Sequence, residues 1–326
     1  MQVKSKSWPG SVKLMKSICL AILNYNGRNH LEHLLPTACA AAKNFAGNCS
    51  VLVLDNRSTD PDVEWIKRKF PTVEVLIAPK NDFLFSYNWL AEKRTEDILV
   101  LLNNDLKLSP GFVQPLVRHF SFDDVFSVTA TSRDWDDRIF TWGANHLKSH
   151  HGIYYWDCES SRQELSHTLF CSGGFMAVDR KKFLELDGFN RLFWPAYSED
   201  LDLCFRAWRK GWRCIFEPKS IVLHRESGSW SVEGDNRTAR LCLRTSLLFQ
   251  WASLPPSVSR LESGAFVALT MWRKLCRAEF WWPRICISTF LEWNRQRSNY
   301  LGMMTSPAEL EKIQARIAEP VITPAE

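Results

Sequence analysis

The chain has 326 residues, of which 45% are apolar and 24% are charged. This length and apolar content allow one large domain with a filled core and a smaller appendage, and they argue against an intrinsically disordered protein. Lysine and arginine number 41 and aspartate and glutamate 36. This excess is too small to indicate nucleic-acid binding, so we expect no nucleic-acid partner.

The ten cysteines are scattered and include no Cys-x-x-Cys pair, so we expect most of them to be small buried side chains rather than parts of a disulfide framework. Residues 1–16 are basic and contain no apolar core of signal-peptide length. No uninterrupted apolar stretch reaches the roughly 20 residues that span a bilayer. These features predict a cytoplasmic protein.

Short β-rich runs alternate with helical patterns in the first third of the chain. The expected strands are residues 17–24, 51–55, 73–78 and 97–103, and helical patterns lie at 31–45 and 63–70. Apolar strands joined by crossover segments predict an α/β fold with a mainly parallel, Rossmann-like sheet and helices on both faces. Such sheets bind ligands at the carboxyl ends of their strands.

The patterns after residue 105 are less regular. Residues 123–168 mix aromatic and histidine side chains without a clear period, and we expect loops and irregular strands that face an acceptor. Further strands are expected at 175–178, 213–216 and 221–224, with a helix at about 180–186. Another helix is expected to begin at Ser198 as its N-cap and to carry Glu199 and Asp200 in its first turn.

Beyond about residue 233 the sequence becomes rich in arginine, leucine and tryptophan. Residues 233–305 are compatible with helices, and two alternatives stay open for them. They form a helical cap that buries its tryptophans against the core, or they make peripheral contact with a membrane, where basic helices that carry tryptophan lie in the interface. Residues 306–326 contain three prolines and predict a flexible tail.

Polar residues with distinct chemistry follow the expected strands. Asp55 is suited to accept a hydrogen bond from the N–H of a nucleobase, and Ser58 lies in the same turn. Asp105 is a hard oxygen ligand for Mg or Mn, and His224 offers a second ligand because imidazole also binds Mn. Either Asp200 or Glu199 is suited to act as a general base. Each residue alone has a structural explanation as a turn former, a dipole partner or a structural histidine, but together they indicate metal-assisted transfer from a nucleotide donor.

Five ordered sequence blocks resemble the family 2 glycosyltransferases, the inverting enzymes of the GT-A fold. The blocks are SICLAILNYNG, VLVLDNRSTD, ILVLLNNDLKLSPGF, CSGGFMAVDRKKFLELDGFN and YSEDLDLCFRAWRKGW, and the resemblance extends from about Ile18 to His224. It implies transfer, with inversion, of a sugar from a UDP- or dTDP-sugar to an acceptor hydroxyl in surface polysaccharide or glycolipid assembly. The implied partners are a nucleotide-sugar donor and a glycan or lipid-linked glycan acceptor.

The resemblance also implies a role for each matching residue. Asp55 stands at the base-binding aspartate, Asp105 at the metal ligand of the Asp-x-Asp signature, and His224 at a late histidine that completes the metal site in some members. Asp200 stands at the catalytic base, beside Glu199, and the implied cofactor is Mn or Mg. The expected donor-binding residues are Asn24, Asn26, Asp55, Ser58, Asn81, Asn103, Asn104, Gly173 and Gly174. The Asn103-Asn104-Asp105 triplet is similar to that of bacterial rhamnosyltransferase-like members.

Two segments depart from the family pattern. Phe83 replaces a glycine in the loop that begins at Asn81, and Phe85 and Tyr87 replace small residues. Asn103 replaces the first aspartate of the signature, which leaves Asp105 as the only carboxylate of the triplet.

The expected organisation is a basic extension (1–16), a catalytic domain (17–232), a helical, tryptophan-rich region (233–305) and a tail (306–326). Contact of the helical region with lipid would place the protein at the inner face of the cell membrane. Two other classes remain: a non-catalytic nucleotide-sugar or glycan-binding protein of the same fold, and a nucleotidyltransferase, which the lack of a glycine-rich, lysine-containing phosphate loop disfavours.

Overall fold

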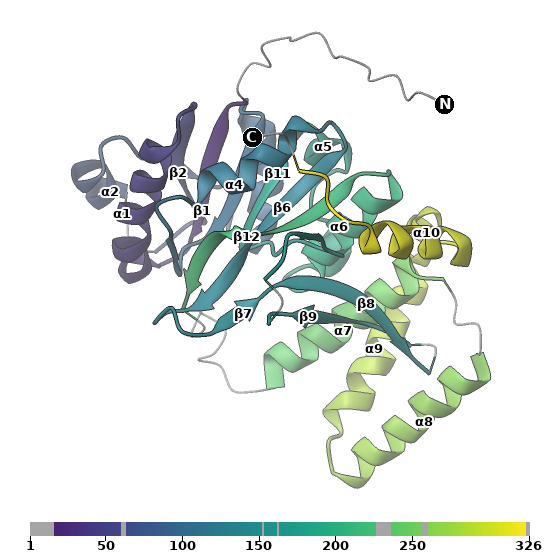
Figure 1. Cartoon of the computed structure of the whole chain (residues 1–326). Helices are drawn as coiled ribbons and strands as arrows, with labels where there is room; N and C mark the ends of the chain where they lie inside the picture. The colour runs from purple at the N-terminus through teal and green to yellow at the C-terminus, as the bar shows by residue number, and fades with distance from the viewer. Residues whose placement is uncertain are drawn as a thin grey trace, which may run out of the picture.

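The computed structural model of the protein describes residues 16–59, 63–151, 153–161, 163–225, 236–255 and 260–323. Within these ranges a central sheet carries helices on both of its faces, and a group of further helices extends from one side (Figure 1). The basic extension expected at residues 1–16 lies outside the described residues except for Lys16. No helix of the described part is both long and apolar enough to cross a membrane.

Ten described strands form the central sheet and two more form a separate hairpin. The strands are β1 (Ile18–Asn24), β2 (Cys49–Asp55), β3 (Glu74–Ile77), β4 (Ile98–Asn103), β5 (Leu106–Leu108), β6 (Val125–Asp134), β7 (Phe140–Trp142), β8 (Ala144–His150), β9 (Ile153–Glu159), β10 (Ser166–His167), β11 (Phe175–Asp179) and β12 (Arg213–His224). The order in the sheet is β10-β12-β6-β11-β4-β1-β2-β3, with β5 beside β12 and β7 beside β6, and β8 pairs with β9.

The directions of the strands determine which ends meet. The expected parallel pairing is present from β3 through β2 and β1 to β4. β11 runs antiparallel to β4 and to β6, and β12 is parallel to β6. Because two antiparallel steps restore the original direction, β6 and β12 end at the same edge of the sheet as β1, β2 and β4. The sheet is thus mixed, but one edge collects strand ends from both halves.

Helices cover both faces of the sheet, as the sequence predicts. They are α1 (Arg28–Asn44), α2 (Val63–Lys69), α3 (Ser86–Lys93), α4 (Val113–Arg118), α5 (Arg180–Glu185), α6 (Glu199–Arg209), α7 (Asn236–Ser253), α8 (Arg260–Cys276), α9 (Trp281–Gln296) and α10 (Pro307–Ala318), with 3-10 turns at Phe83–Phe85, His119–Ser121, Arg191–Phe193, Arg297–Asn299 and Leu301–Met303. One core lies under α1, α2 and α4, and the other under α3, α5 and α6. Consecutive residues of β1, such as Ala21 and Ile22, belong to opposite cores, as the two-residue period of a strand requires.

Residues 123–168 contain more regular structure than the sequence indicated. β6 runs for 10 residues, and its first 8 are buried in the middle of the sheet. Residues 126–131 alternate apolar and polar side chains, FSVTAT, with the two-residue period of a strand. The expectation of loops and irregular strands overlooked this short pattern, and both faces of the strand are buried, including its serines and threonines. The strands expected at 213–216 and 221–224 are one continuous strand, β12, whose pairing with β6 is irregular between Glu217 and Ile221, around Pro218.

Two expectations about helix ends and the tail are also corrected. Ser198 precedes α6, but its backbone is left-handed with a φ of 62° and its side chain makes no capping bond; its hydroxyl instead donates to Thr245 Oγ1 at 3.3 Å. Within the expected tail, residues 307–318 form α10, which buries Leu310, Ile313 and Ile317. The Ser306-Pro-Ala-Glu309 sequence starts this helix, with Ser306 Oγ accepting from Glu309 N at 3.2 Å.

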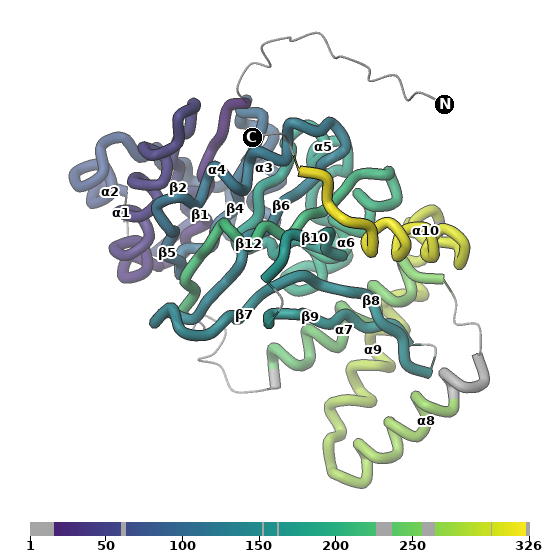
Figure 2. Tube along the Cα trace, viewed as in Figure 1, coloured from purple at the N-terminus to yellow at the C-terminus, as the bar shows by residue number. Residues whose placement is uncertain are grey.

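The region after residue 233 is helical, as expected. α7 packs against the core through Leu248, Phe249 and Ala252, α9 packs on α7, and the contacts of α8 are chiefly with α9. Figure 2 shows α7, α9 and α8 as successive layers that lead away from the sheet. Part of the region therefore caps the core, and its outermost helix does not.

Candidate functional site

Polar residues gather at the edge of the sheet where β1, β2, β4, β6 and β12 end. Asn24 lies opposite Asp55 in the β1–β2 pair, and Asn103 lies opposite Leu23 in the β1–β4 pair. His224 is the last residue of β12. Since β11 runs the other way, its beginning lies at this edge, and Asn103 N donates to Gly174 O at 2.8 Å. The structure therefore brings together strand ends that are up to 200 residues apart in sequence (224 against 24).

Asp55 is buried and shapes the turn that follows β2. Its Oδ1 accepts from Ser58 N at 2.8 Å, and Ser58 Oγ accepts from Asn26 N at 2.9 Å. Asn26 in turn accepts from Thr59 N at 2.7 Å. Asp55 Oδ2 makes no hydrogen bond with any described residue, so one carboxylate oxygen forms the turn and the other remains for a ligand.

Asn24 and Asn104 use their amides within the protein. Asn104 Nδ2 donates to Asn24 Oδ1 at 2.9 Å, and Asn24 is fully buried. Gly27 allows this pairing because a Cβ there would lie 2.0 Å from Asn104 Nδ2. These two residues hold the loop after β4 against the loop after β1, which sets the position of Asp105.

Asp105 and His224 form a candidate metal centre. Their facing atoms, Asp105 Oδ2 and His224 Nε2, are 3.4 Å apart. Asp105 is 9% exposed, and its Oδ1 is buried without a hydrogen-bond partner. A buried carboxylate oxygen without a partner is unfavourable unless a cation or water satisfies it. An oxygen and an imidazole nitrogen in this arrangement fit Mn or Mg.

Glu199 and Asp200 open α6 after two left-handed residues, Tyr197 and Ser198. Asp200 Oδ2 accepts from Gly173 N at 3.0 Å and its Oδ1 from Leu201 N at 2.8 Å. Burial raises the pKa of Asp200 to about 6, although the bond from Gly173 opposes the shift. Burial and then the charge of Asp200 raise the pKa of Glu199 to about 8. The pair thus combines an ionisable carboxylate with a neighbour that keeps its proton at neutral pH.

Gly173 and Gly174 permit close approach at the same edge. A Cβ at Gly173 would lie 2.6 Å from Leu84 Cδ2 and 3.5 Å from Asp200 Cβ, and one at Gly174 would lie 2.7 Å from Asn103 Nδ2. The two glycines therefore let the loop before β11 pass between Asp200 and the end of β4.

The loop that starts at Asn81 keeps a glycine-like backbone despite its bulky residues. Phe83 has a φ of 53°, in the left-handed region that favours glycine, and Asn81 Oδ1 accepts from Phe83 N at 3.3 Å. Tyr87 is fully buried, and its hydroxyl lies 3.0 Å from Ala21 O and 2.9 Å from Leu102 O. Phe83 and Tyr87, two of the residues that depart from the family pattern, thus have structural roles, in the loop and between β1 and β4.

Asn56, Asp82 and Arg191 were not expected at the site. Buried Asn56 donates to Phe83 O at 3.2 Å and accepts from Ser86 Oγ. Asp82 pairs with Arg191, whose Nη1 lies 2.8 Å from Asp82 Oδ1. These contacts tie the loop after β3 to the turn before α6. The sequence offered one indication of Asn56, which is that it follows Asp55 directly. It offered none for the pairing of Asp82 with Arg191, because these residues are 109 positions apart.

Two positively charged side chains near the candidate metal centre, those of Lys107 and Arg225, were also not predicted from the sequence. Arg225 follows His224, and the backbone N–H of Arg225 donates to the backbone carbonyl of Asp105 at 3.0 Å. The Arg225 guanidinium lies 5.3 Å from the Trp135 ring, and Lys107 Nζ lies 3.8 Å from it. Trp135 thus holds two positive charges beside the edge, where an anionic ligand would meet them.

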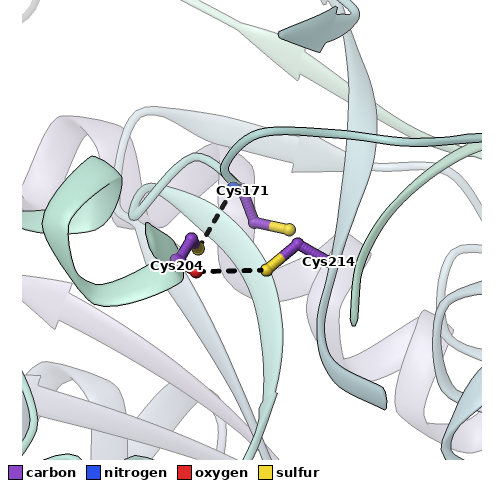
Figure 3. Close-up of side chains that lie close together, drawn as sticks. All are labelled: Cys171, Cys204 and Cys214. Carbon is purple, nitrogen blue, oxygen red and sulfur yellow. Dashed lines mark hydrogen bonds between the residues drawn. The ribbon is translucent and has the colours of Figure 1, made fainter. Parts of the chain in front are cut away.

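Figure 3 shows a second group that could hold a metal, the buried thiols of Cys171, Cys204 and Cys214. Each thiol already has a partner. Cys204 Sγ accepts from Cys171 N at 3.4 Å, and the Cys171 and Cys214 thiols donate to Ile215 O and Cys204 O at 3.7 and 3.9 Å. Burial raises the pKa of Cys171 and Cys214 well above the ordinary range, which favours neutral thiols at these two positions. At Cys204, burial also acts to raise the pKa, but hydrogen bonds from Cys171 and Cys214 outweigh burial and lower the pKa. All ten cysteines are free, but only four are fully buried.

Comparisons with known proteins identify the family to which the chain belongs. The family described as Glycosyl transferase family 2 matches residues 19–187, which is more than half of the chain, and the protein belongs to that family. The N-acetylglucosaminyl-diphospho-decaprenol L-rhamnosyltransferases of two Mycobacterium tuberculosis strains, CDC 1551 / Oshkosh and ATCC 25618 / H37Rv, are each 25% identical to it over 240 residues, or 64% of this chain and 75% of theirs.

A solved structure of GalNAc-T7 with UDP, GalNAc and Mn2+ has a TM-score of 0.54 and 15% identity, and the match covers 74% of this chain. The chain spans 49% of the length of that structure. This likeness supports the GT-A fold expected from the sequence.

Proposed function

We propose that this glycosyltransferase moves a sugar from a nucleoside-diphosphate sugar to an acceptor hydroxyl, with inversion at the anomeric carbon. The observation that carries the proposal is the junction at Gly173 and Gly174. Gly173 N donates to the carboxylate of Asp200, and Gly174 O accepts from Asn103 N at the end of β4. Asp105 follows two residues later and faces His224, so all of these groups lie at one edge of the sheet. A base and a metal centre at the same edge are what such a transfer requires.

In this proposal the donor binds along the loops after β1, β2 and β4. Asp55 Oδ2 accepts the ring N–H of uracil or thymine, and Asn26 and Ser58 hold the turn that presents it. Asn81 supports the loop beside Asn56, and Asn24 and Asn104 support the loop that carries Asp105. Asn103, Gly173 and Gly174 line the approach to the sugar, and a side chain on the glycines would crowd Leu84 and Asn103.

Asp105 and His224 would hold Mn or Mg, which supplies positive charge for the departing diphosphate when it is bound. The orphaned Asp105 Oδ1 is the atom that supports this assignment, and the Mn2+ of the GalNAc-T7 structure is in keeping with it. Lys107 and Arg225, held at Trp135, add charge to the same end of the site.

Asp200 acts as the base. Its carboxylate takes the proton of the acceptor hydroxyl, and the oxygen attacks the anomeric carbon from the side opposite the nucleoside diphosphate. The new C–O bond forms as the bond to the diphosphate breaks, and the proton stays on Asp200. Glu199, with its higher pKa, holds its proton at neutral pH, so that Asp200 faces no second charge.

The mycobacterial relatives are named as rhamnosyltransferases that act on a diphospho-decaprenol-linked sugar. By analogy, we propose a dTDP- or UDP-sugar as donor and a lipid-linked glycan as acceptor, used at the cytoplasmic face of a membrane. The catalytic domain would comprise residues 17–232, and the helical region 233–305 would lie on the acceptor side.

A donor screen tests the proposal. Purified protein with Mn2+ or Mg2+ is offered UDP- and dTDP-sugars with a lipid-linked N-acetylglucosamine acceptor, and release of nucleoside diphosphate and the anomeric configuration of the product are measured. Transfer with inversion is the expected result. Binding of a donor without turnover of any would favour a non-catalytic nucleotide-sugar-binding protein instead.

A further inference from the structure

The outermost helices of the protein expose large apolar side chains to solvent. On α8, Leu269, Trp272 and Leu275 are exposed, and on α9 so are Ile287 and Leu291. Phe280, between the helices, is 64% exposed and Trp272 is 63% exposed. Spacings of three and four residues place these side chains on one face of each helix. We call these six residues the α8–α9 surface.

The charges around this surface are mainly positive. Residues 260–300 contain seven lysines and arginines and three glutamates, a net charge of +4. Two of these glutamates are neutralised, because Glu279 pairs with Lys274 and Glu292 pairs with Arg244. Arg273, Arg277 and Arg284 are exposed and make no ion pair with any described carboxylate. The surface is therefore apolar with free cations beside it.

We propose that the α8–α9 surface docks on an anionic lipid bilayer. Exposed tryptophan, phenylalanine and leucine beside unpaired arginines suit the boundary between acyl chains and anionic headgroups. A second copy of the chain could also cover the α8–α9 surface. A symmetric contact between two copies would, however, bring the arginines beside the two surfaces together, and their charges would repel. The charge therefore favours lipid over self-association.

Docking in this manner would position the region expected to face the acceptor. Phe266 of α8 stacks on His151 at 5.2 Å and meets His150 edge-on at 5.8 Å, so the tip of the β8–β9 hairpin rests on α8. A cavity of about 400 Å³ at this contact is lined by His150, Ile153, Tyr155 and Phe266. The docked helices would thus hold the hairpin close to the bilayer, where a lipid-linked acceptor would enter. Only this last step rests on the proposed function.

Vesicle sedimentation of the full chain tests the docking. Phosphatidylcholine vesicles are compared with vesicles in which a third of the lipid is phosphatidylglycerol, and we expect binding to the anionic vesicles that high salt reverses. Trp272→Glu combined with Phe280→Glu should weaken binding at least about tenfold, because two charges would enter the apolar boundary. The matched control is Ile139→Glu, whose side chain is 64% exposed elsewhere, and it should bind as the unmodified protein does.

The role of charge has its own variants. Replacing Arg273, Arg277 and Arg284 with glutamine should weaken binding to anionic vesicles, whereas replacing Arg68, Lys93 and Lys181, which are exposed on other elements, should not. Equal loss with both triple variants would overturn the docking surface. So would absence of vesicle binding, or a concentration-dependent dimer that Trp272→Glu with Phe280→Glu abolishes. Sugar transfer to a water-soluble acceptor, measured without vesicles, separates a failure of docking from a failure of the proposed function.

Discussion

Gly173 and Asp200 are joined by a 3.0 Å hydrogen bond from the backbone N–H of one to the carboxylate of the other. This bond links the loop before β11 to the first turn of α6 across 27 residues of sequence. Together with the bond from Leu201 N, it fixes both oxygens of the carboxylate, so the proposed base is oriented before an acceptor arrives.

Asp200→Asn removes the proposed base with little change in shape. We expect turnover to fall by roughly 100- to 10,000-fold. The unfolding temperature should fall only slightly, because the amide oxygen keeps the bond from Gly173 N and only the bond from Leu201 N is lost. Nucleoside diphosphate release and thermal unfolding measure the two effects, and the exposed Glu185→Gln is the control. Near-normal turnover would move the role of base to Glu199.

The pH dependence of turnover should report the raised pKa of Asp200, which burial shifts to about 6. The base acts only when it is ionised, so kcat should fall about tenfold per pH unit below that value and level off above it. If the base had the pKa of an ordinary aspartate, about 4, kcat would reach its plateau at a pH about two units lower. Rates from pH 4 to pH 8 at saturating donor decide between the two.

Removal of the metal ligands should affect binding more than folding. Asp105→Ala deletes one oxygen that has no partner in the protein and another that faces His224 Nε2 at 3.4 Å, so the free energy of unfolding without metal should change little. Mn2+ at about 100 times its dissociation constant should stabilise the unmodified protein by about 2.7 kcal/mol and should stabilise Asp105→Ala much less. An equal rise in unfolding temperature for both proteins would place the cation elsewhere, and His224→Ala should behave as Asp105→Ala does.

Gly173→Ala tests the close approach at the base. The new Cβ would lie 2.6 Å from Leu84 Cδ2, so the Leu84 side chain or the loop must shift, and a shift of the loop would carry the bond to Asp200 with it. We expect kcat to fall by up to about 100-fold, with partial recovery in Gly173→Ala combined with Leu84→Ala. Gly111→Ala, which would meet nothing within 4 Å, should be neutral. Failure of the second substitution to restore any activity would show that Leu84 is not the obstacle.

Glu199→Gln should change how stability depends on pH. The folded-state pKa of Glu199 is raised above its unfolded value, to about 8, so the native state of the unmodified protein binds the extra proton. Stability from this group is present below about pH 4 and is lost as pH rises through 8. The unfolding temperature of the variant relative to the unmodified protein should therefore increase from pH 5 to pH 9. A constant difference would mean that Glu199 is not buried as a neutral acid.

Local sequence patterns were sufficient to predict a strand and a site residue where the polar residue directly follows the apolar run of the strand. β1, β2 and β4 and the polar residues after them were predicted in this way, because apolar runs that end in asparagine or aspartate mark strand ends. β6 was missed because the short alternating pattern of residues 126–131 was overlooked, and the cap at Ser198 was wrong because its backbone is left-handed. The functional roles of Asp55, Asp105, Asp200 and His224 stay predictions until the variants are measured.

The sequence by itself determined the family, the α/β class and the candidate residues, since these depend on the order of short motifs. The tertiary structure alone decided that Asp105 faces His224, that Gly173 holds Asp200, and that α8 lies outside the core while α10 packs into it. The physical reason is that pairing, burial and pKa depend on neighbours that are distant along the chain. Such contacts exist only once the antiparallel β11 has brought both halves of the sheet to one edge.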